Sequence, residues 1–230
     1  MQEALGFNFP RLEQQPARGD TLQIVGYGPS ILETWRKIDD GPVLSLSGAH
    51  DFLIQRDIHP TWHADCDPRR HKSEFVKHPS PRTLYLMATC CHPQAWRYLL
   101  RSRVLLWHAD NGPETRAWLS ANDPGWWAIR PGPSIGTAAL ELARILGFSR
   151  VRCFGYDSCF VEEAQNAGPS ERPYSTEQPQ VLTVNGVAYV TTENMKRQAE
   201  EFTNFARGLQ VELVGEGLLK AMMRKEKETA

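Results

Sequence analysis

The stretch WWAIRPGPSIGTAALELARILGFSRVRCFGYD, residues 126–157, decides the fold class of this chain. Its two ends, 126–130 and 151–157, are short apolar runs typical of buried strands. The residues between them carry apolar side chains at helical spacing, which predicts a helix that begins at Ser134 and packs closely on a sheet. Strand, helix and strand in this order predict a βαβ unit with parallel strands.

The same alternation fills most of the chain before residue 126. Helical or turn-like segments separate further short apolar runs, which we interpret as strands. We therefore expect an α/β fold, a Rossmann-like and mostly parallel sheet with helices on both faces. The additional strands are expected at 22–25, 42–47, 61–65, 83–89 and 103–109.

The rhythm stops after Asp157, and this sets the expected domain organisation. Residues 158–192 are interpreted as a loop and hairpin insertion, because Asn185-Gly186 suits a type I′ turn between apolar runs. An amphipathic helix, a strand and a helix follow and complete a C-terminal β-hairpin/helix extension. We expect an N-terminal arm at 1–20, one domain at 21–225 and a charged tail at 226–230.

Composition narrows the classes of partner. The 230 residues carry a formal net charge of −1, which gives no electrostatic reason to expect nucleic-acid or membrane-surface binding. No apolar run approaches a membrane span and no signal-peptide core is present, so we expect a cytoplasmic protein; a homo-oligomer stays open. The five cysteines include no Cys-x-x-Cys pair, which favours reduced core thiols over disulfides or structural zinc.

Ligands of parallel sheets bind beyond the carboxyl ends of the strands, and the first such end reads GYGPS. Gly26 and Gly28 permit close approach of a ligand, and Pro29 suits a first helical position. Free amides and the Ser30 hydroxyl are candidates to hold a phosphate. A tight turn with a serine cap is the alternative, and the pattern matches neither the dinucleotide fingerprint nor a Walker A loop.

Asp65 and Asp67 follow the third strand and are the candidate metal ligands. Two carboxylates one residue apart can converge on Mg²⁺, which prefers oxygen ligands and often takes one or two carboxylates plus substrate phosphates. The alternatives are a cap on the next helix, or pairing with Arg69 or Arg70.

Other strand ends supply further candidates. At the end of the fifth strand, His108 is a candidate general acid or base. Asp110 is a candidate catalytic residue or metal ligand, and Asn111 is a candidate binding residue. The alternative is a turn that caps the next helix. Asp157, after the seventh strand, is a candidate binding residue for a ribose hydroxyl, a metal or a loop amide, and capping is the simpler interpretation. The remaining expected binding residues at these ends are Gly48, His50, Ser134 and Gly155.

The order of VGYGPSI, HADCD, WHADNG and FGYDS resembles the 6-hydroxymethylpterin diphosphokinase-like (MptE-like) family, over roughly residues 22–215. The resemblance implies transfer of a diphosphate from ATP to a pterin alcohol with Mg²⁺. It implies that Asp65 and Asp67 hold the metal, and it matches Asp110-Asn111, Gly155 and Asp157 to family positions. The archaeal enzymes carry an acidic segment where this chain has residues 134–137, and Asp-Gly near Ser47-Gly48.

The leading hypothesis is therefore a Mg²⁺-dependent transferase that uses a nucleotide and a small-molecule acceptor. The GPS loop also resembles that of bacterial sialyltransferases, and related domains occur in flagellin-modifying proteins. A glycosyltransferase that uses a CMP or UDP sugar is the second hypothesis, with His50 or His108 as the base. The third is a non-catalytic, prophage-associated binding module, motivated by the missing acidic residues at 134–137.

Overall fold

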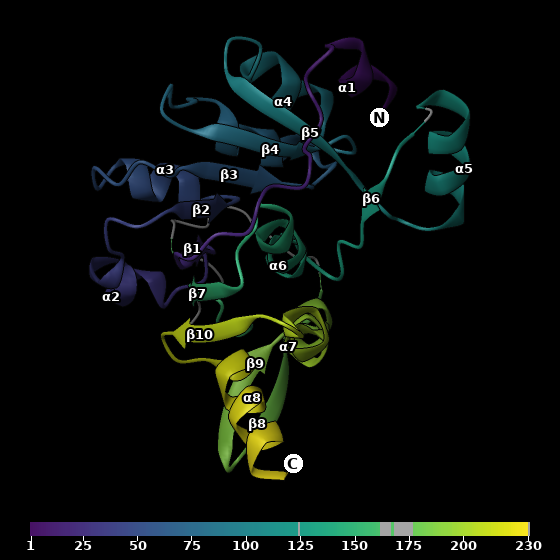
Figure 1. Ribbon diagram of the computed structural model, residues 1–230. Coiled ribbons are helices and arrows are strands. Elements are labelled where there is room, and N and C mark those ends of the chain that lie inside the picture. Colours follow the sequence, from purple (N-terminus) through teal and green to yellow (C-terminus); the bar gives the residue numbers. More distant parts are fainter. Residues whose placement is uncertain (124, 162–166, 168–176, 230) are drawn as a thin grey trace.

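The computed structural model describes residues 1–123, 125–161, 167 and 177–229. Its centre is an eight-stranded sheet in the order β10-β7-β1-β2-β3-β4-β5-β6, in which every pairing is parallel (Figure 1). The strands are β1 (Leu22–Val25), β2 (Val43–Leu46), β3 (Trp62–Asp65), β4 (Leu84–Ala88), β5 (Arg103–Ala109), β6 (Ala128–Ile129), β7 (Arg150–Phe154) and β10 (Gln210–Val214).

The sheet is covered on both faces, as its continuous apolar strands require. Successive side chains of a strand point to opposite faces, and in β1 Ile24 joins the larger apolar cluster whereas Val25 joins a smaller one. Helix α6 contributes to the larger cluster, and α2 and α3 to the smaller. The predicted α/β class is therefore confirmed.

The helices that connect the strands are mostly short. The exceptions before the C-terminal region are α5, with ten residues, and α6, with eleven. In α6 the side chain of Ser134 accepts hydrogen bonds from the amides of Gly136 and Thr137 and so caps the helix. The helices are α1 (Gln2–Gly6), α2 (Ile31–Thr34), α3 (Ala49–Ile54), α4 (Pro93–Tyr98), α5 (Pro113–Asn122), α6 (Ile135–Ile145), α7 (Glu193–Ala206) and α8 (Leu218–Thr229), with 3₁₀ turns η1 (Trp35–Lys37) and η2 (Arg70–Val76).

The C-terminal group gathers at the β10 edge of the sheet, where it appears in green and yellow in Figure 1. Strands β8 (Gln180–Val184) and β9 (Val187–Thr191) form a separate antiparallel hairpin. Asn185 and Gly186 both have positive φ, 50° and 79°, as the predicted type I′ turn requires. The predicted hairpin/helix extension is confirmed, and α8 continues to Thr229 through most of the segment expected as a tail.

The N-terminal segment is bound to the sheet beyond α1. Leu12 is fully buried, and its amide donates to the carbonyl of Leu106 at 2.8 Å. The amide of Arg18 donates to the carbonyl of Gly147 in the same way. Among the described residues no helix combines the length and the apolar character that crossing a bilayer requires.

The strand order creates a topological switch at β1. From β1 the chain proceeds outward through β2 to β6, then returns to β7 on the other side of β1 and ends in β10. From the carboxyl ends of β1 and β7 the chain therefore continues towards opposite edges of the sheet. In open parallel sheets this is the place where ligands bind.

Candidate functional site

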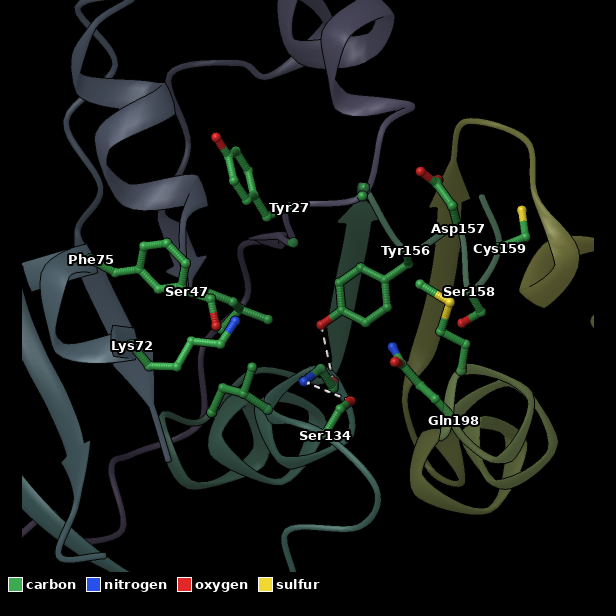
Figure 2. A pocket seen from close by; sticks show the side chains of 17 residues that line it. Tyr27, Ser47, Lys72, Phe75, Ser134, Tyr156, Asp157, Ser158, Cys159 and Gln198 are labelled. Carbon is green, nitrogen blue, oxygen red and sulfur yellow. Dashed lines mark hydrogen bonds between the residues drawn. The ribbon is translucent and has the colours of Figure 1, made fainter. Parts of the chain in front are cut away.

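A pocket opens at this switch point (Figure 2). Its floor is formed by the loops after β1 and β7, and its volume is about 170 Å³. Pockets that enclose a drug-sized ligand measure roughly 300–1,000 Å³. The space therefore fits part of a larger molecule, such as the phosphates and an adjoining group, with the remainder lying outside.

The two loops of the floor meet backbone to backbone. Gly26 donates its amide to the carbonyl of Phe154 at 2.8 Å, and Gly28 donates to the carbonyl of Gly155 at 3.0 Å. A Cβ on Gly28 would lie 2.6 Å from that carbonyl oxygen, and one on Gly155, whose φ is +64°, would lie 2.6 Å from the carbonyl of Gly26. These glycines line the pocket, but their first structural role is to let the loops touch.

Ser30 is tied to Asp157 across the same contact. The Ser30 amide donates to Oδ2 of Asp157 at 2.8 Å, and the Ser30 hydroxyl donates to Oδ1. Burial raises the pKa of the Asp157 carboxyl, and the two hydrogen bonds from Ser30 oppose that rise. The carboxylate thus accepts from the amide and the hydroxyl that the sequence analysis assigned to a phosphate, which is the loop-amide role expected for Asp157. Pro29 precedes Ser30 and is not part of the lining.

One end of the pocket is cationic and aromatic. Lys72 reaches into it from η2, and Figure 2 shows it with Phe75, Tyr27 and Ser47 on the same side. The Lys72 ammonium lies 4.9 Å from the centre of the Phe75 ring. Burial lowers the pKa of Lys72, and the charges of Asp67 and Asp65 oppose that shift. Ser47 has a positive φ of 47°, a strained conformation for a residue other than glycine.

The N-terminus of α6 borders the middle of the pocket through residues 134–136. The helix has eleven residues, so its dipole places partial positive charge at this end. Ser134 and Thr137 form a reciprocal capping box, and the Tyr156 hydroxyl donates to the carbonyl of Gly136 at 3.0 Å. Ser134 therefore combines the predicted place at the pocket with a structural role as the helix cap.

The opposite end of the pocket is neutral. It is formed by Ser158 and Cys159, which follow β7, and by Met195 and Gln198 of α7 (Figure 2). Burial raises the pKa of the Cys159 thiol, which keeps it uncharged. The Ser158 side chain is buried and its hydroxyl has no hydrogen-bond partner among the described residues.

Asp65 and Asp67 lie outside the lining and are linked to it through Lys72, whose charge acts on both. Asp65 is 4% exposed, and its Oδ1 accepts the amides of Cys66 and Asp67 at 2.7 and 3.1 Å. Burial raises the pKa of Asp65 to about 6, with a further contribution from the charge of Asp67. Burial acts upward on Asp67 as well, but hydrogen bonds from Arg69 bring its pKa below the ordinary value.

The chemistry of this carboxylate pair suits Mg²⁺. Both donors are hard oxygens, and the upward effect of Asp67 on the Asp65 pKa shows two negative charges close together, which a cation would relieve. No cluster of three or more possible ligands occurs in the described part of the chain. A Mg²⁺ ion would therefore take its remaining ligands from water and substrate phosphates, as is common for this ion. Arg69 holds Asp67 at 2.5 Å, the pairing that the sequence left open.

The candidates after β2 support the aromatic end from behind. A Cβ on Gly48 would lie 2.4 Å from the Tyr27 ring, so this glycine lets the ring lie against α3. His50 is fully buried; its Nδ1 lies 2.7 Å from Oδ1 of Asp51 and its Nε2 lies 2.8 Å from the hydroxyl of Tyr85. Neither Gly48 nor His50 lines the pocket.

The candidates at the end of β5 and directly after it are not brought to this pocket. Four strand spacings separate β5 from β1, which amounts to about 19 Å. His108 Nε2 lies 2.7 Å from Oδ2 of Asp123, while its Nδ1 lies 2.8 Å from the hydroxyl of Thr89. Asp110 pairs with Arg116 at 2.9 Å and accepts the amide of Gly112, which is the capping turn left open above. Asn111 lies next to Cys90.

Sequence reasoning missed several residues of the lining. Lys72 lies in the polar run after Asp67, where the density of basic residues was the available signal. Tyr27 lies directly between the predicted positions Gly26 and Gly28. Gln198 and Met195 carried no signal of a site, because their place on an amphipathic helix says nothing about which loop that helix covers.

The comparisons with known proteins complete the description of the site. The family described as "6-hydroxymethylpterin diphosphokinase MptE-like" matches residues 2–163. The structure of the Maf glycosyltransferase from Magnetospirillum magneticum AMB-1 is similar, with a TM-score of 0.69 at 13% identity. The similarity covers 99% of this chain and 40% of that one, so this chain spans less than half of that protein. No curated protein matches.

Proposed function

Because this chain belongs to the MptE-like family, we propose that it is a Mg²⁺-dependent transferase whose donor nucleotide binds in the pocket between β1 and β7. The observation that carries the proposal is the joint presence of Lys72 and the N-terminus of α6 in one pocket at the topological switch. Both favour an anion, and phosphates commonly bind at helix N-termini of this kind.

The metal would be held by Asp65, the last residue of β3, and by Asp67, which follows it at the same edge of the sheet. When bound, Mg²⁺ neutralises charge on transferring phosphates. Lys72 connects this carboxylate pair with the pocket. Its charge acts on both carboxylates, and its side chain lines the pocket. The chain's own contribution is to orient the phosphates between Lys72 and α6.

The first reaction to test is diphosphate transfer from ATP to an alcohol. The hydroxyl oxygen of the acceptor forms a bond to the β-phosphorus of ATP, and the bond from that phosphorus to the oxygen bridging to the α-phosphorus breaks. AMP leaves with the bridging oxygen, and the hydroxyl proton passes to solvent. Catalysis then rests mainly on positioning and on neutralisation of charge at the transferred group.

Calorimetry with ATP, CTP and CMP, each with and without Mg²⁺, tests the binding part of the proposal. We expect at least one nucleotide to bind, and Mg²⁺ to tighten the binding of the intact chain. The Asp65→Asn/Asp67→Asn variant should retain weak binding and lose the effect of Mg²⁺. No binding of any nucleotide, or an unchanged Mg²⁺ effect in that variant, overturns the proposal.

An exposed acidic residue provides the matched control. Asp40 is exposed and lies at the opposite end of β2 from the pocket, so Asp40→Asn should leave both affinity and Mg²⁺ dependence unchanged. If Asp40→Asn reproduced the loss, the effect would come from net charge rather than from a metal site.

Glycosyl transfer from a nucleotide sugar is the second candidate, because the similar solved structure is a glycosyltransferase. In that reaction the acceptor oxygen bonds to the anomeric carbon of the sugar, the bond from that carbon to the phosphate oxygen breaks, and the acceptor proton passes to solvent. Incubation with CMP and UDP sugars separates the two candidates. Release of CMP or UDP favours glycosyl transfer, whereas AMP release from ATP favours diphosphate transfer; absence of all three favours a binding module.

A further inference from the structure

The neutral end of the pocket carries an inference about substrate recognition, which rests on the proposed function and deepens it. We propose that Ser158 and Gln198 form a subsite for an uncharged group that bears hydroxyl or amide functions, such as a sugar ring or a heterocycle. The phosphates would lie at the opposite end, beside Lys72. Figure 2 shows Lys72 and Ser158 on opposite sides of Tyr156.

The hydroxyl of Ser158 is unsatisfied among the described residues. The residue is 7% exposed, lines the pocket, and its Oγ has no hydrogen-bond partner in the described part of the chain. Buried polar groups are nearly always hydrogen-bonded, because burial without a partner is unfavourable. A ligand that exchanges a hydrogen bond with this hydroxyl removes the deficit.

The protein holds the backbone of Ser158 in place. The carbonyl of Ser158 accepts a hydrogen bond from the hydroxyl of the fully buried Thr191 at 2.8 Å. The backbone of Ser158 also has a positive φ of 53°, a strained conformation that persists only where surrounding contacts impose it. The hydroxyl is therefore presented at a fixed position in the pocket wall.

Helix α7 contributes one wall of this end of the pocket. Met195 and Gln198 are three residues apart and so lie on the same side of the helix. Gln198 lies against the start of α6, since a Cβ on Gly136 would come within 3.0 Å of its Nε2. No hydrogen bond joins the side-chain amide of Gln198 to another described residue. An amide in this position can both donate to and accept from a ligand.

The charge at this end of the pocket disfavours a phosphate. Ser158, Met195 and Gln198 are neutral, and the nearest acidic group is Asp157, whose carboxylate is held by Ser30. Since the described residues that line this end include no cation, a phosphate placed here would meet the Asp157 carboxylate without a compensating positive charge, whereas an uncharged hydroxyl or amide would not be repelled. The α7 residues lie beyond the span of 2–163 that the family matches.

Methionine-methyl NMR on the intact chain tests the subsite directly. The chain has five methionines, and a Met195→Leu variant assigns the Met195 signal. The probes are N-acetylglucosamine, 6-hydroxymethylpterin and inorganic diphosphate. We expect at least one of the two neutral probes to shift the Met195 signal in a saturable way, and the identity of that probe distinguishes a sugar from a heterocycle. Diphosphate should leave the signal unchanged.

Two single variants then assign the contact. Ser158→Ala and Gln198→Ala should each weaken binding of the neutral probe by about three- to tenfold, the loss typical of one neutral hydrogen bond. The matched control Asn204→Ala changes an exposed amide on the same helix and should have no effect. Thermal unfolding of each variant identifies loss of folding, and Gln198→Ala carries the test if Ser158→Ala is unstable.

Failure of this inference is distinguishable from failure of the proposed function. If neither neutral probe shifts the Met195 signal, or if both variants bind the probe as the parent does, the subsite is overturned. The same holds if diphosphate shifts the Met195 signal and Ser158→Ala abolishes that shift. Loss of nucleotide binding with an intact response to the neutral probe would instead count against the proposed function alone.

Discussion

Ser30 donates both its backbone amide and its hydroxyl to the carboxylate of Asp157. The two residues follow different strands, β1 and β7, which are neighbours in the sheet. Their contact joins the two loops on either side of the topological switch. The Asp157 carboxylate therefore holds the two loops of the pocket floor together. Lys72 and the N-terminus of α6 are the groups that would contact the phosphates of the proposed ligand.

Removal of this carboxylate should destabilise the fold. Asp157→Ala leaves the Ser30 amide and hydroxyl without their acceptor, which costs about 1–3 kcal/mol of unfolding free energy. Urea denaturation of Asp157→Ala, Ser30→Ala and the double variant measures both the loss and the coupling. The exposed Asp40→Ala serves as control. Additive losses in the double variant would show that the contact contributes no coupling energy.

A side chain at Gly155 should be poorly tolerated. Its φ of +64° disfavours other residues, and a Cβ would approach the carbonyl oxygen of Gly26 to 2.6 Å. We expect Gly155→Ala to lower the unfolding free energy by about 2–4 kcal/mol, through strain and through separation of the two loops. Gly19→Ala is the control, since nothing lies within 4 Å of its added Cβ. Equal stability of the two variants would contradict the close loop contact.

Stability should fall as the pH falls from about 6.5 to about 4 through the contribution of His108. Burial, and then the charges of Arg11 and the N-terminus, lower the pKa of His108 to about 4. The unfolded chain takes up a proton that folded His108 resists, so the contribution is present above pH 6.5 and is lost towards pH 4. A shift of this size corresponds to about 3 kcal/mol.

Urea unfolding at several pH values measures this dependence. His108→Gln keeps a donor and an acceptor but does not titrate, and it should flatten the decline between pH 6.5 and 4. His63, whose pKa burial also lowers, would retain its own share of the decline. An unchanged profile in His108→Gln would show that His108 does not resist protonation.

Lys72→Ala should weaken binding of inorganic diphosphate and of the donor nucleotide by about ten- to a hundredfold, as expected when a charge-assisted hydrogen bond is lost. Calorimetry measures the affinity. The control is Lys77→Ala, a half-exposed lysine that follows the same 3₁₀ turn and pairs with Glu74. Comparable losses in both variants would indicate a general effect of positive charge rather than a contact in the pocket.

The sequence was sufficient for most of the sheet, because its strands are short apolar runs bounded by glycine, proline or polar residues. The run 103–109 coincides with β5. The run 126–130 shortens to β6, Ala128–Ile129, since this edge strand pairs with one neighbour only. The last run, expected to reach Asp157, ends at Phe154 because Gly155 turns the chain into a left-handed conformation.

The site was predictable only in part. Local patterns placed Gly28, Ser134 and Asp157 at strand ends, and the sheet order brings all three to one pocket. The same patterns placed Asp110 at a strand end too, but β5 lies four strands away from β1. Gln198 reaches the pocket from a distant helix. Strand order and the docking of α7 depend on contacts between remote segments, and local periodicity does not encode them.

The backbone contact between Gly26 and Gly155 has a thermodynamic consequence. Because backbone hydrogen bonds of the pocket floor continue the ladder between β1 and β7, the shape of the floor is set by backbone contacts and not by rotamers that a ligand must order. Folding has already fixed the conformation of this floor, so binding of a ligand costs little further conformational entropy there. At the floor, affinity therefore depends on how well a ligand's own groups match a backbone surface that is already in place, and the ordering cost falls on wall side chains such as Lys72 and Gln198.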